Sequence, residues 1–204
     1  MDHLKFSSLL CSQVCHDLAG PLSVIDNTLE LINPEELRDI NPEEFNFISK
    51  ATKQSVIQLK FLRILFGNTQ KTLKLNDIFI ISDQYLGLKG IKLLWVRKNL
   101  PIEANAIFIK LVMSFFYGSK IIIPYGGDIK VNHKSENDFE IEFISKKIID
   151  DEKIFNLINS KSIYEVNDTK FLPFMFSCFL KNKLEFEVKK TSKNNSIIYK
   201  ANKR

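Results

Sequence analysis

Apolar residues recur at spacings of three and four along the first third of the chain, a pattern typical of two amphipathic helices. The first helix is predicted over residues 3–32, ending before Pro34, because the residue before a proline disfavours helical geometry. The second is predicted over residues 42–66, with Asn41 as N-cap and Pro42 in the first helical position. The apolar positions are Leu10, Val14, Leu18, Leu22, Ile25, Leu29 and Ile32 in the first helix, and Phe45, Ile48, Val56, Leu59, Leu62 and Phe66 in the second.

Two antiparallel helices make only half of a stable bundle, because each keeps a broad apolar stripe uncovered. A second copy of the chain would bury both stripes in a four-helix bundle, so we predict a homodimer. The predicted dimer core consists of Leu10, Val14, Leu18, Leu22, Ile25, Leu29, Val56, Leu59 and Leu62.

Short strands and helices are expected in the remainder of the chain. Period-2 alternation marks the strands, as at Phe139, Ile141 and Phe143. We predict strands near 72–75, 91–96, 128–133, 138–145, 183–190 and 196–201, and helices near 77–87, 102–119, 151–159 and 170–180; residues 191–195 would join the last two strands. The predicted fold is therefore α+β, with a helical hairpin over 1–67 and an α/β sandwich over 68–204.

The distribution of charge follows the same division. Residues 1–66 hold 6 Lys/Arg and 9 Asp/Glu, a net charge of −3, whereas residues 67–204 hold 23 and 15, a net charge of +8, which together give the +5 of the chain. We interpret the basic half as a solvated lysine surface; a surface that steers an acidic protein partner and a nucleic-acid patch are the alternatives. Arginine side chains, which form paired hydrogen bonds to bases and phosphates, dominate nucleic-acid recognition. The small number of arginines here therefore disfavours a nucleic-acid-binding surface.

Further features bear on the compartment. The chain has no apolar run near the roughly 18 residues that span a membrane, and its start lacks the basic and apolar regions of a signal peptide. Three cysteines do not form a disulfide framework, so we expect a cytoplasmic protein. Cys11 and Cys15 lie four residues apart and could share a metal; we interpret them, with Cys178, as buried core thiols, and His133 as structural.

His16 lies opposite the apolar stripe of the first helix. At about 100° per residue from Leu10, the stripe centres near 60° and His16 falls near 240°. One interpretation is a surface histidine without a role. The other is a reactive histidine that a partner protein can approach closely, because the neighbouring residues on this face are small or polar. These residues are Ser12, Ala19, Gly20, Ser23 and Asn27. Asp17 follows the histidine directly, and Pro21 leaves the Asp17 carbonyl without its helical donor, which predicts a local kink.

The segment Cys15-His16-Asp17-Leu18-Ala19-Gly20-Pro21-Leu22 resembles the H-box of histidine kinases. The wider run from Leu9 through Pro21, Ile25 and Asn27 to Leu31 is closer still to the ChpT-type bacterial histidine phosphotransferases. This resemblance covers the hairpin strongly and the remainder only in its order of elements. It implies a dimerising phosphotransfer hairpin followed by a degenerate ATPase-like domain of the GHKL class.

Three departures from the kinase pattern fall at the nucleotide site. Residues 108–116 lack the asparagines that hold magnesium, residues 145–149 replace an Asp-x-Gly-x-Gly motif, and residues 169–174 replace the glycine-rich lid. The last 77 residues contain no glycine at all, although glycines let backbone N–H groups approach phosphates closely. We therefore expect no bound ATP, no other cofactor and no metal in this chain.

The resemblance implies a phosphorelay intermediate. His16 would accept a phosphoryl group from a receiver-domain aspartate and pass it to other receivers, Asp17 would orient the imidazole, and the receiver would supply magnesium. The residues expected to contact the receiver are Ser12, Gln13, Ala19, Gly20, Ser23 and Asn27. The implied partners are the receivers of a CckA-type hybrid kinase and of CtrA-type and CpdR-type response regulators, with the C-terminal domain as a second docking surface. An ATP-dependent kinase core and a non-catalytic dimeric adaptor are the alternatives.

Overall fold

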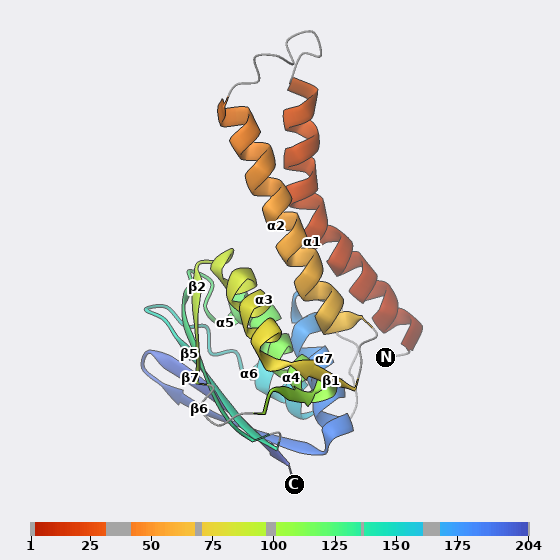
Figure 1. Cartoon of the computed structure of the whole chain (residues 1–204). Coiled ribbons are helices and arrows are strands. Elements are labelled where there is room, and N and C mark those ends of the chain that lie inside the picture. Colours follow the sequence, from red (N-terminus) through yellow and green to blue (C-terminus); the bar gives the residue numbers. More distant parts are fainter. Residues whose placement is uncertain are drawn as a thin grey trace.

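The computed structural model describes residues 3–31, 42–67, 71–96, 101–135, 137–160 and 168–203. Two long antiparallel helices, α1 (His3–Leu31) and α2 (Pro42–Phe66), project from one end of a mixed α/β unit (Figure 1). The predicted hairpin is confirmed, as is the α+β class. None of the helices in the described ranges is both long and apolar enough to cross a membrane.

The α/β unit is built on a five-stranded sheet. Its order is β2-β4-β5-β7-β6, in which β2 and β4 run parallel and the other neighbours antiparallel. The strands are β2 (Ile91–Val96), β4 (Gly127–Ser135), β5 (Asp138–Ile144), β6 (Phe186–Lys193) and β7 (Ser196–Lys203). Alternate residues of each strand are buried, which leaves the other sheet face in contact with solvent.

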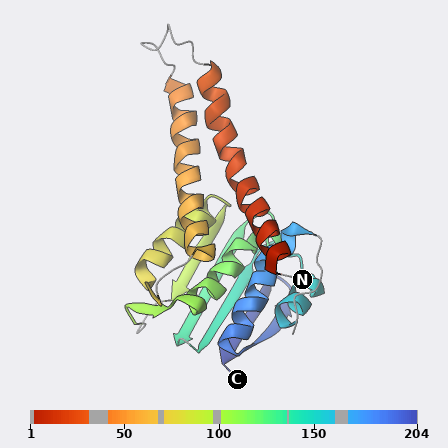
Figure 2. The same cartoon turned by 90° about the vertical axis from the view of Figure 1, so that its right-hand side faces the viewer.

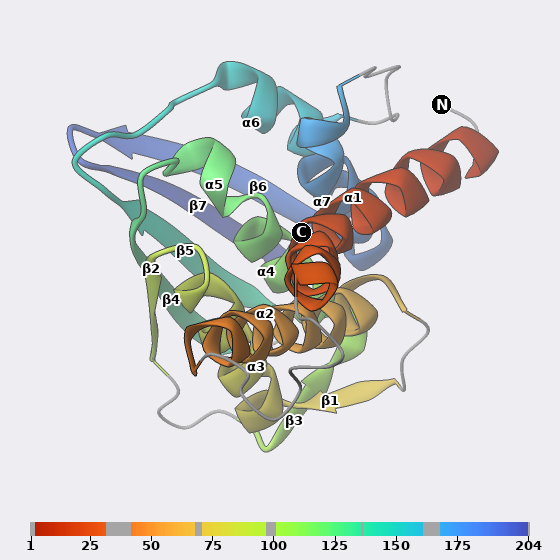
Figure 3. The same cartoon turned by 90° about the horizontal axis from the view of Figure 1, so that it is seen from above.

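Helices cover one face of this sheet (Figures 2 and 3). They are α3 (Leu75–Gly87), α4 (Ala106–Tyr117), the short α5 (Ser119–Ile122), α6 (Glu152–Asn159), the 3-10 turn η2 (Thr169–Phe171) and α7 (Leu172–Leu184). A separate two-stranded ribbon pairs β1 (Thr72–Lys74) with β3 (Glu103–Asn105). Nearly every side chain of α4 is buried, so this helix lies at the centre of the core.

Some predicted boundaries were wrong. The helix expected over 102–119 begins only at Ala106, because residues 103–105 form β3 and the Asn105 side chain caps the helix, accepting from the N–H groups of Ile107 and Phe108 at 2.9 and 3.3 Å. The strand expected over 183–190 begins at Phe186, because α7 runs to Leu184 and ends at Glu185, in the left-handed region with φ of 59°. The turn predicted over 191–195 shortens to residues 194–195.

The core continues from the base of the hairpin into the α/β unit. Phe61, Leu62 and Leu65 of α2 are buried together with Tyr85 of α3 and the inner face of the sheet. The boundary predicted at residue 67 therefore separates two kinds of secondary structure, while one hydrophobic core spans it.

Aromatic rings join the lower ends of both long helices to the α/β unit. Phe66 of α2 meets Tyr117 and Phe176 edge-on, with ring centroids 5.5 and 5.1 Å apart, and Phe6 of α1 stacks on Phe176 at 6.3 Å. These contacts fix the hairpin through its base, because aromatic pairs favour defined geometries over and above their burial.

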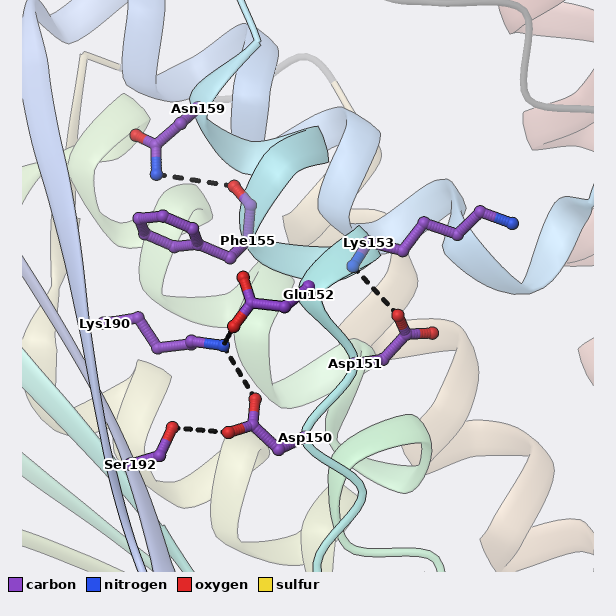
Figure 4. Close-up of polar contacts among 8 residues, drawn as sticks. All are labelled: Asp150, Asp151, Glu152, Lys153, Phe155, Asn159, Lys190 and Ser192. Carbon is purple, nitrogen blue, oxygen red and sulfur yellow. Dashed lines mark hydrogen bonds and ion pairs between the residues drawn. The ribbon is translucent and has the colours of Figure 1, made fainter.

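A polar cluster ties α6 to the edge strand β6 (Figure 4). The Lys190 ammonium contacts Asp150 Oδ1 at 2.8 Å and also Glu152, while the Ser192 hydroxyl donates to Asp150 Oδ2 at 2.5 Å. The Asp151 carboxylate caps α6 by accepting from the Lys153 N–H at 2.9 Å. Lys190 thus holds the segment that enters α6 against the sheet.

Candidate functional site

His16 lies on the outer face of α1, where 84% of its side chain is exposed. Because α1 is continuous through this region, residues three, four, seven and eleven positions away share the same face. The structure leaves all five small or polar residues predicted for this face exposed: Ser12, Ala19, Gly20, Ser23 and Asn27. The imidazole is therefore open to a large partner.

Asp17 lies about 100° round the helix from His16 and faces the α/β unit. Its side chain is 23% exposed, and its two oxygens accept different hydrogen bonds: Oδ1 from the Gln13 amide at 2.9 Å and Oδ2 from the Tyr117 hydroxyl at 2.5 Å. The distance from Asp17 Oδ1 to His16 Nδ1 is 3.6 Å, longer than a hydrogen bond. Gln13 was predicted to contact the receiver, but the structure places it beside Asp17, half-buried.

A small cavity of 170 Å³ separates this part of α1 from the α/β unit. Its lining residues are Gln13, Asp17, Lys89, Tyr117, Ile121, Thr169, Lys170 and Pro173. Burial raises the pKa of Tyr117, and the hydrogen bond to Asp17 raises it further. Burial lowers the pKa of Lys89, while the negative charge of Asp17 acts in the opposite direction. The cavity therefore combines one carboxylate with two lysines and a protonated phenol.

Sequence reasoning missed Tyr117 and Lys89 as members of this site. Both lie far from His16 in the sequence and occur in segments dominated by core residues. A buried tyrosine needs a partner for its hydroxyl, which is the signal that could have drawn attention to Tyr117.

Pro21 lies inside α1, which nevertheless continues to Leu31. The helix changes direction along its length, as the views from the side and from above show (Figures 1 and 3). A proline removes one helical hydrogen bond and is the commonest cause of such a bend. The bend turns the upper part of α1 away from the α/β unit.

The upper part of the hairpin keeps apolar side chains in contact with solvent. Leu22 and Leu29 of α1 are each 52% exposed, and Val56 and Leu59 of α2 are 44% and 54% exposed. Leu10, Val14, Leu18 and Ile25 are half-buried, Val14 and Leu18 against the chain's own core. Leu62 is different: it is 3% exposed within its own chain, so its assignment to a dimer core was wrong.

The cysteines correct another expectation. Cys178 is buried, but Cys11 and Cys15 are exposed. At about 100° per residue from Leu10, these two thiols fall near 100° and 140°, on either side of Leu22 near 120°. They were expected in a core because they lie on the apolar stripe, but a single chain leaves that stripe exposed to solvent.

His133, interpreted as structural, is buried on β4 with its ring 4.8 Å from that of Phe108.

Aromatic side chains fill the space between α4, α7 and the sheet. The Phe115 ring lies 6.4 Å from Phe174 and 5.3 Å from Tyr199, all three of them buried. Phe174 also packs against Gly118, where an added Cβ would come within 2.6 Å of its ring. Residues 169–174, which take the place of the glycine-rich lid of kinases, thus contribute bulky side chains to the core.

Comparison with known proteins gives one curated relative. The chain is 25% identical over 131 residues to the protein phosphotransferase ChpT of Brucella abortus (strain 2308). The aligned region spans 63% of this chain and 60% of that relative, about three fifths of its length. No family model matches the chain.

Among solved structures, a bacterial phosphotransferase has the same fold: the TM-score is 0.80 at 20% identity, over 98% of this chain and 97% of the other. The histidine kinase AdeS of Acinetobacter baumannii overlaps more weakly, with a TM-score of 0.44 and 12% identity over 91% and 95% of the two chains.

Proposed function

We propose that this chain is a histidine phosphotransferase of a two-component phosphorelay, with His16 as the residue that carries the phosphoryl group. The observation that carries the proposal is the position of His16: its imidazole is 84% exposed and has a carboxylate beside it. The small neighbours on its face leave room for a receiver domain. The likeness to a protein phosphotransferase supports the same chemistry.

The proposed step begins with an aspartyl phosphate on a receiver. A lone pair of the neutral His16 imidazole attacks phosphorus, an N–P bond forms, the acyl O–P bond breaks, and the receiver aspartate leaves as a carboxylate. The reverse step on a second receiver returns the phosphoryl group to an aspartate. Such transfers depend mainly on in-line positioning and on neutralising the oxygen charge. Magnesium for that neutralisation would come with the receiver.

The exposed apolar stripe supports a homodimer. Leu22, Leu29, Val56 and Leu59 all face solvent in the single chain, although burial of such side chains is favourable. A second hairpin would cover them in a four-helix bundle and leave His16 on the outside. Cys11 and Cys15 would then be covered as well.

The proposed phosphoryl donor is another protein rather than ATP. Phe115 of α4 packs against the buried rings of Phe174 and Tyr199, and this bulky packing supports a domain without a nucleotide site. We further propose that the partners are the receivers of a hybrid histidine kinase and of response regulators, and that the basic α/β unit helps to dock them.

The test uses the 204-residue chain with a receiver labelled on its aspartate with radioactive phosphate. Label should move to the native chain as an acid-labile, alkali-stable adduct, should not move to His16→Ala, and should then pass to a second receiver. His133→Ala is the matched control, because His133 is a buried histidine of the α/β unit. Folded His133→Ala should accept label as the native chain does. Label on His16→Ala, or none on the native chain, would refute the mechanism. Labelling by ATP alone would favour a kinase, and receiver binding without transfer an adaptor.

A further inference from the structure

We propose that Tyr117 is a positioning residue for phosphoryl transfer at His16, acting through Asp17. The inference rests on the proposed function and deepens it, because it makes the α/β unit part of the reacting site. The two residues lie 100 positions apart and on different elements, α4 and α1, yet share one hydrogen bond.

The Asp17 carboxylate is held at both oxygens. The Tyr117 bond, at 2.5 Å, has the length of a charge-assisted O–H···O⁻ contact, and the Gln13 amide donates to the other oxygen at 2.9 Å. Gln13 lies on the same helix and moves with Asp17, whereas Tyr117 belongs to the α/β unit. Of the two described hydrogen-bond donors to Asp17, Tyr117 is therefore the one that fixes the carboxylate relative to the core.

Tyr117 is itself a rigid donor. It is buried at the end of α4, and its ring meets Phe66 edge-on at 5.5 Å. A buried phenol that has lost contact with water gains by keeping its single acceptor. An aspartate on a solvated helix changes rotamer freely, but Asp17 cannot do so without removing the acceptor of the Tyr117 O–H. The same hydroxyl also has a side-chain hydrogen bond with Gln13.

The fixed carboxylate selects one tautomer of the imidazole. Asp17 Oδ1 lies 3.6 Å from His16 Nδ1, so a hydrogen bond would require the exposed imidazole to move about 0.4 Å closer. A neutral imidazole carries one N–H; with the proton on Nδ1, the lone pair is on Nε2. The nitrogen that would attack a receiver phosphate then points away from Asp17.

The same contacts limit charge repulsion. A phosphoryl group on His16 would bring negative charge close to Asp17. The Tyr117 hydroxyl and the Lys89 ammonium stabilise the Asp17 charge from the side of the α/β unit, and the Gln13 amide stabilises it from within α1. Loss of the Tyr117 hydroxyl should therefore affect both the tautomer of His16 and the rate of its phosphorylation.

The experiment compares Tyr117→Phe, which keeps the ring but removes the hydroxyl, with Tyr199→Phe, which removes another buried phenol in the sheet. In Tyr117→Phe the transfer rate at saturating receiver should fall about tenfold, the cost of one charge-assisted hydrogen bond, with little change in the receiver concentration for half-maximal rate. Nitrogen NMR of His16 should show a smaller fraction protonated on Nδ1. Tyr199→Phe should change neither quantity.

A double-mutant cycle shows whether Tyr117 acts through Asp17. In an Asp17→Asn background, Tyr117→Phe should change the rate less than about twofold, because the carboxylate it positions is gone. Equal effects in both backgrounds, or an unchanged His16 tautomer in folded Tyr117→Phe, would overturn the inference. The NMR measurement needs no receiver, so it tests the positioning role even if native His16 accepts no label and the proposed function fails.

Discussion

The rings of Phe61 and Tyr85 lie parallel, with centroids 3.8 Å apart and an angle of 6° between their planes. Phe61 belongs to α2 and Tyr85 to α3, and both are almost completely buried. This stack joins the hairpin to the α/β unit inside the hydrophobic core. The orientation of the proposed phosphotransfer face relative to the sheet therefore depends on core packing.

Phe61→Ala should lower the free energy of unfolding by about 3–5 kcal/mol, because it leaves a large cavity in a rigid core. Phe179→Ala is the matched control: this phenylalanine of α7 is 43% exposed, and its loss should cost about 1 kcal/mol or less. Urea unfolding followed by circular dichroism measures both. Equal losses of unfolding free energy in the two variants would show that the Phe61–Tyr85 stack stabilises the fold no more than an exposed phenylalanine does.

Val56→Asp combined with Leu59→Asp should convert the proposed dimer into a monomer of 23.7 kDa. Burying two unpaired carboxylates should weaken association at least about a hundredfold. Light scattering coupled to gel filtration gives the mass. Ile102→Asp adds a charge at an apolar residue that is 83% exposed in the α/β unit, and this control should stay dimeric. A native chain that elutes as a monomer would contradict the prediction.

The second helix of the hairpin was predictable from sequence almost to the residue. It begins at Pro42 and ends at Phe66, next to Gly67, and both ends depend on local chemistry. The predicted end of α1 at residue 32 and the Asn41 N-cap lie outside the described residues. The error at residues 102–105 has another origin. Glu103 pairs with Lys74 and accepts from the Thr72 hydroxyl, partners about thirty residues away that no local pattern reveals.

The candidate site likewise contains residues that local sequence reveals and residues that only tertiary packing brings in. His16 was found because its face, its neighbours and Pro21 are all local features of one helix. Tyr117 and Lys89 reach Asp17 only through tertiary packing, so the sequence alone assigned Asp17 to the histidine and did not show its contacts with the α/β unit. Cys11 and Cys15 were placed in a core because periodicity identifies an apolar face but does not say what covers it.

Gly118→Ala should lower the free energy of unfolding by about 1–3 kcal/mol, because the new methyl group would overlap the buried Phe174 ring. Gly87→Ala is the control: nothing lies within 4 Å of its Cβ position, and the change should be neutral or stabilising by up to about 1 kcal/mol. Chemical denaturation measures both. Combining Gly118→Ala with Phe174→Leu should recover part of the loss, and no recovery would indicate another cause.

The Lys190 cluster should make stability depend on pH at both ends of the range. Hydrogen bonds from Lys190 and Ser192 lower the pKa of Asp150 below 3.8, so its contribution is present above that value and is lost as the pH falls through the folded-state pKa. Asp150 and Glu152 raise the pKa of Lys190 above 10.5 against the opposing effect of burial, so its contribution is present below that value and is lost as the pH rises through the folded-state pKa.

Lys190→Met should therefore cost about 1 kcal/mol near neutral pH, a modest figure because solvent screens the carboxylates, and less at about pH 3. Urea unfolding at pH 3, 5, 7 and 9 gives the difference from the native chain. Lys189→Met is the control, because Lys189 and Glu187 form a 3.8 Å pair with both side chains largely exposed, and its difference should stay near zero at every pH. A Lys190→Met difference that does not change with pH would mean that the Lys190 ammonium acts through the Phe155 ring, whose centroid lies 5.7 Å away, and not through the two carboxylates.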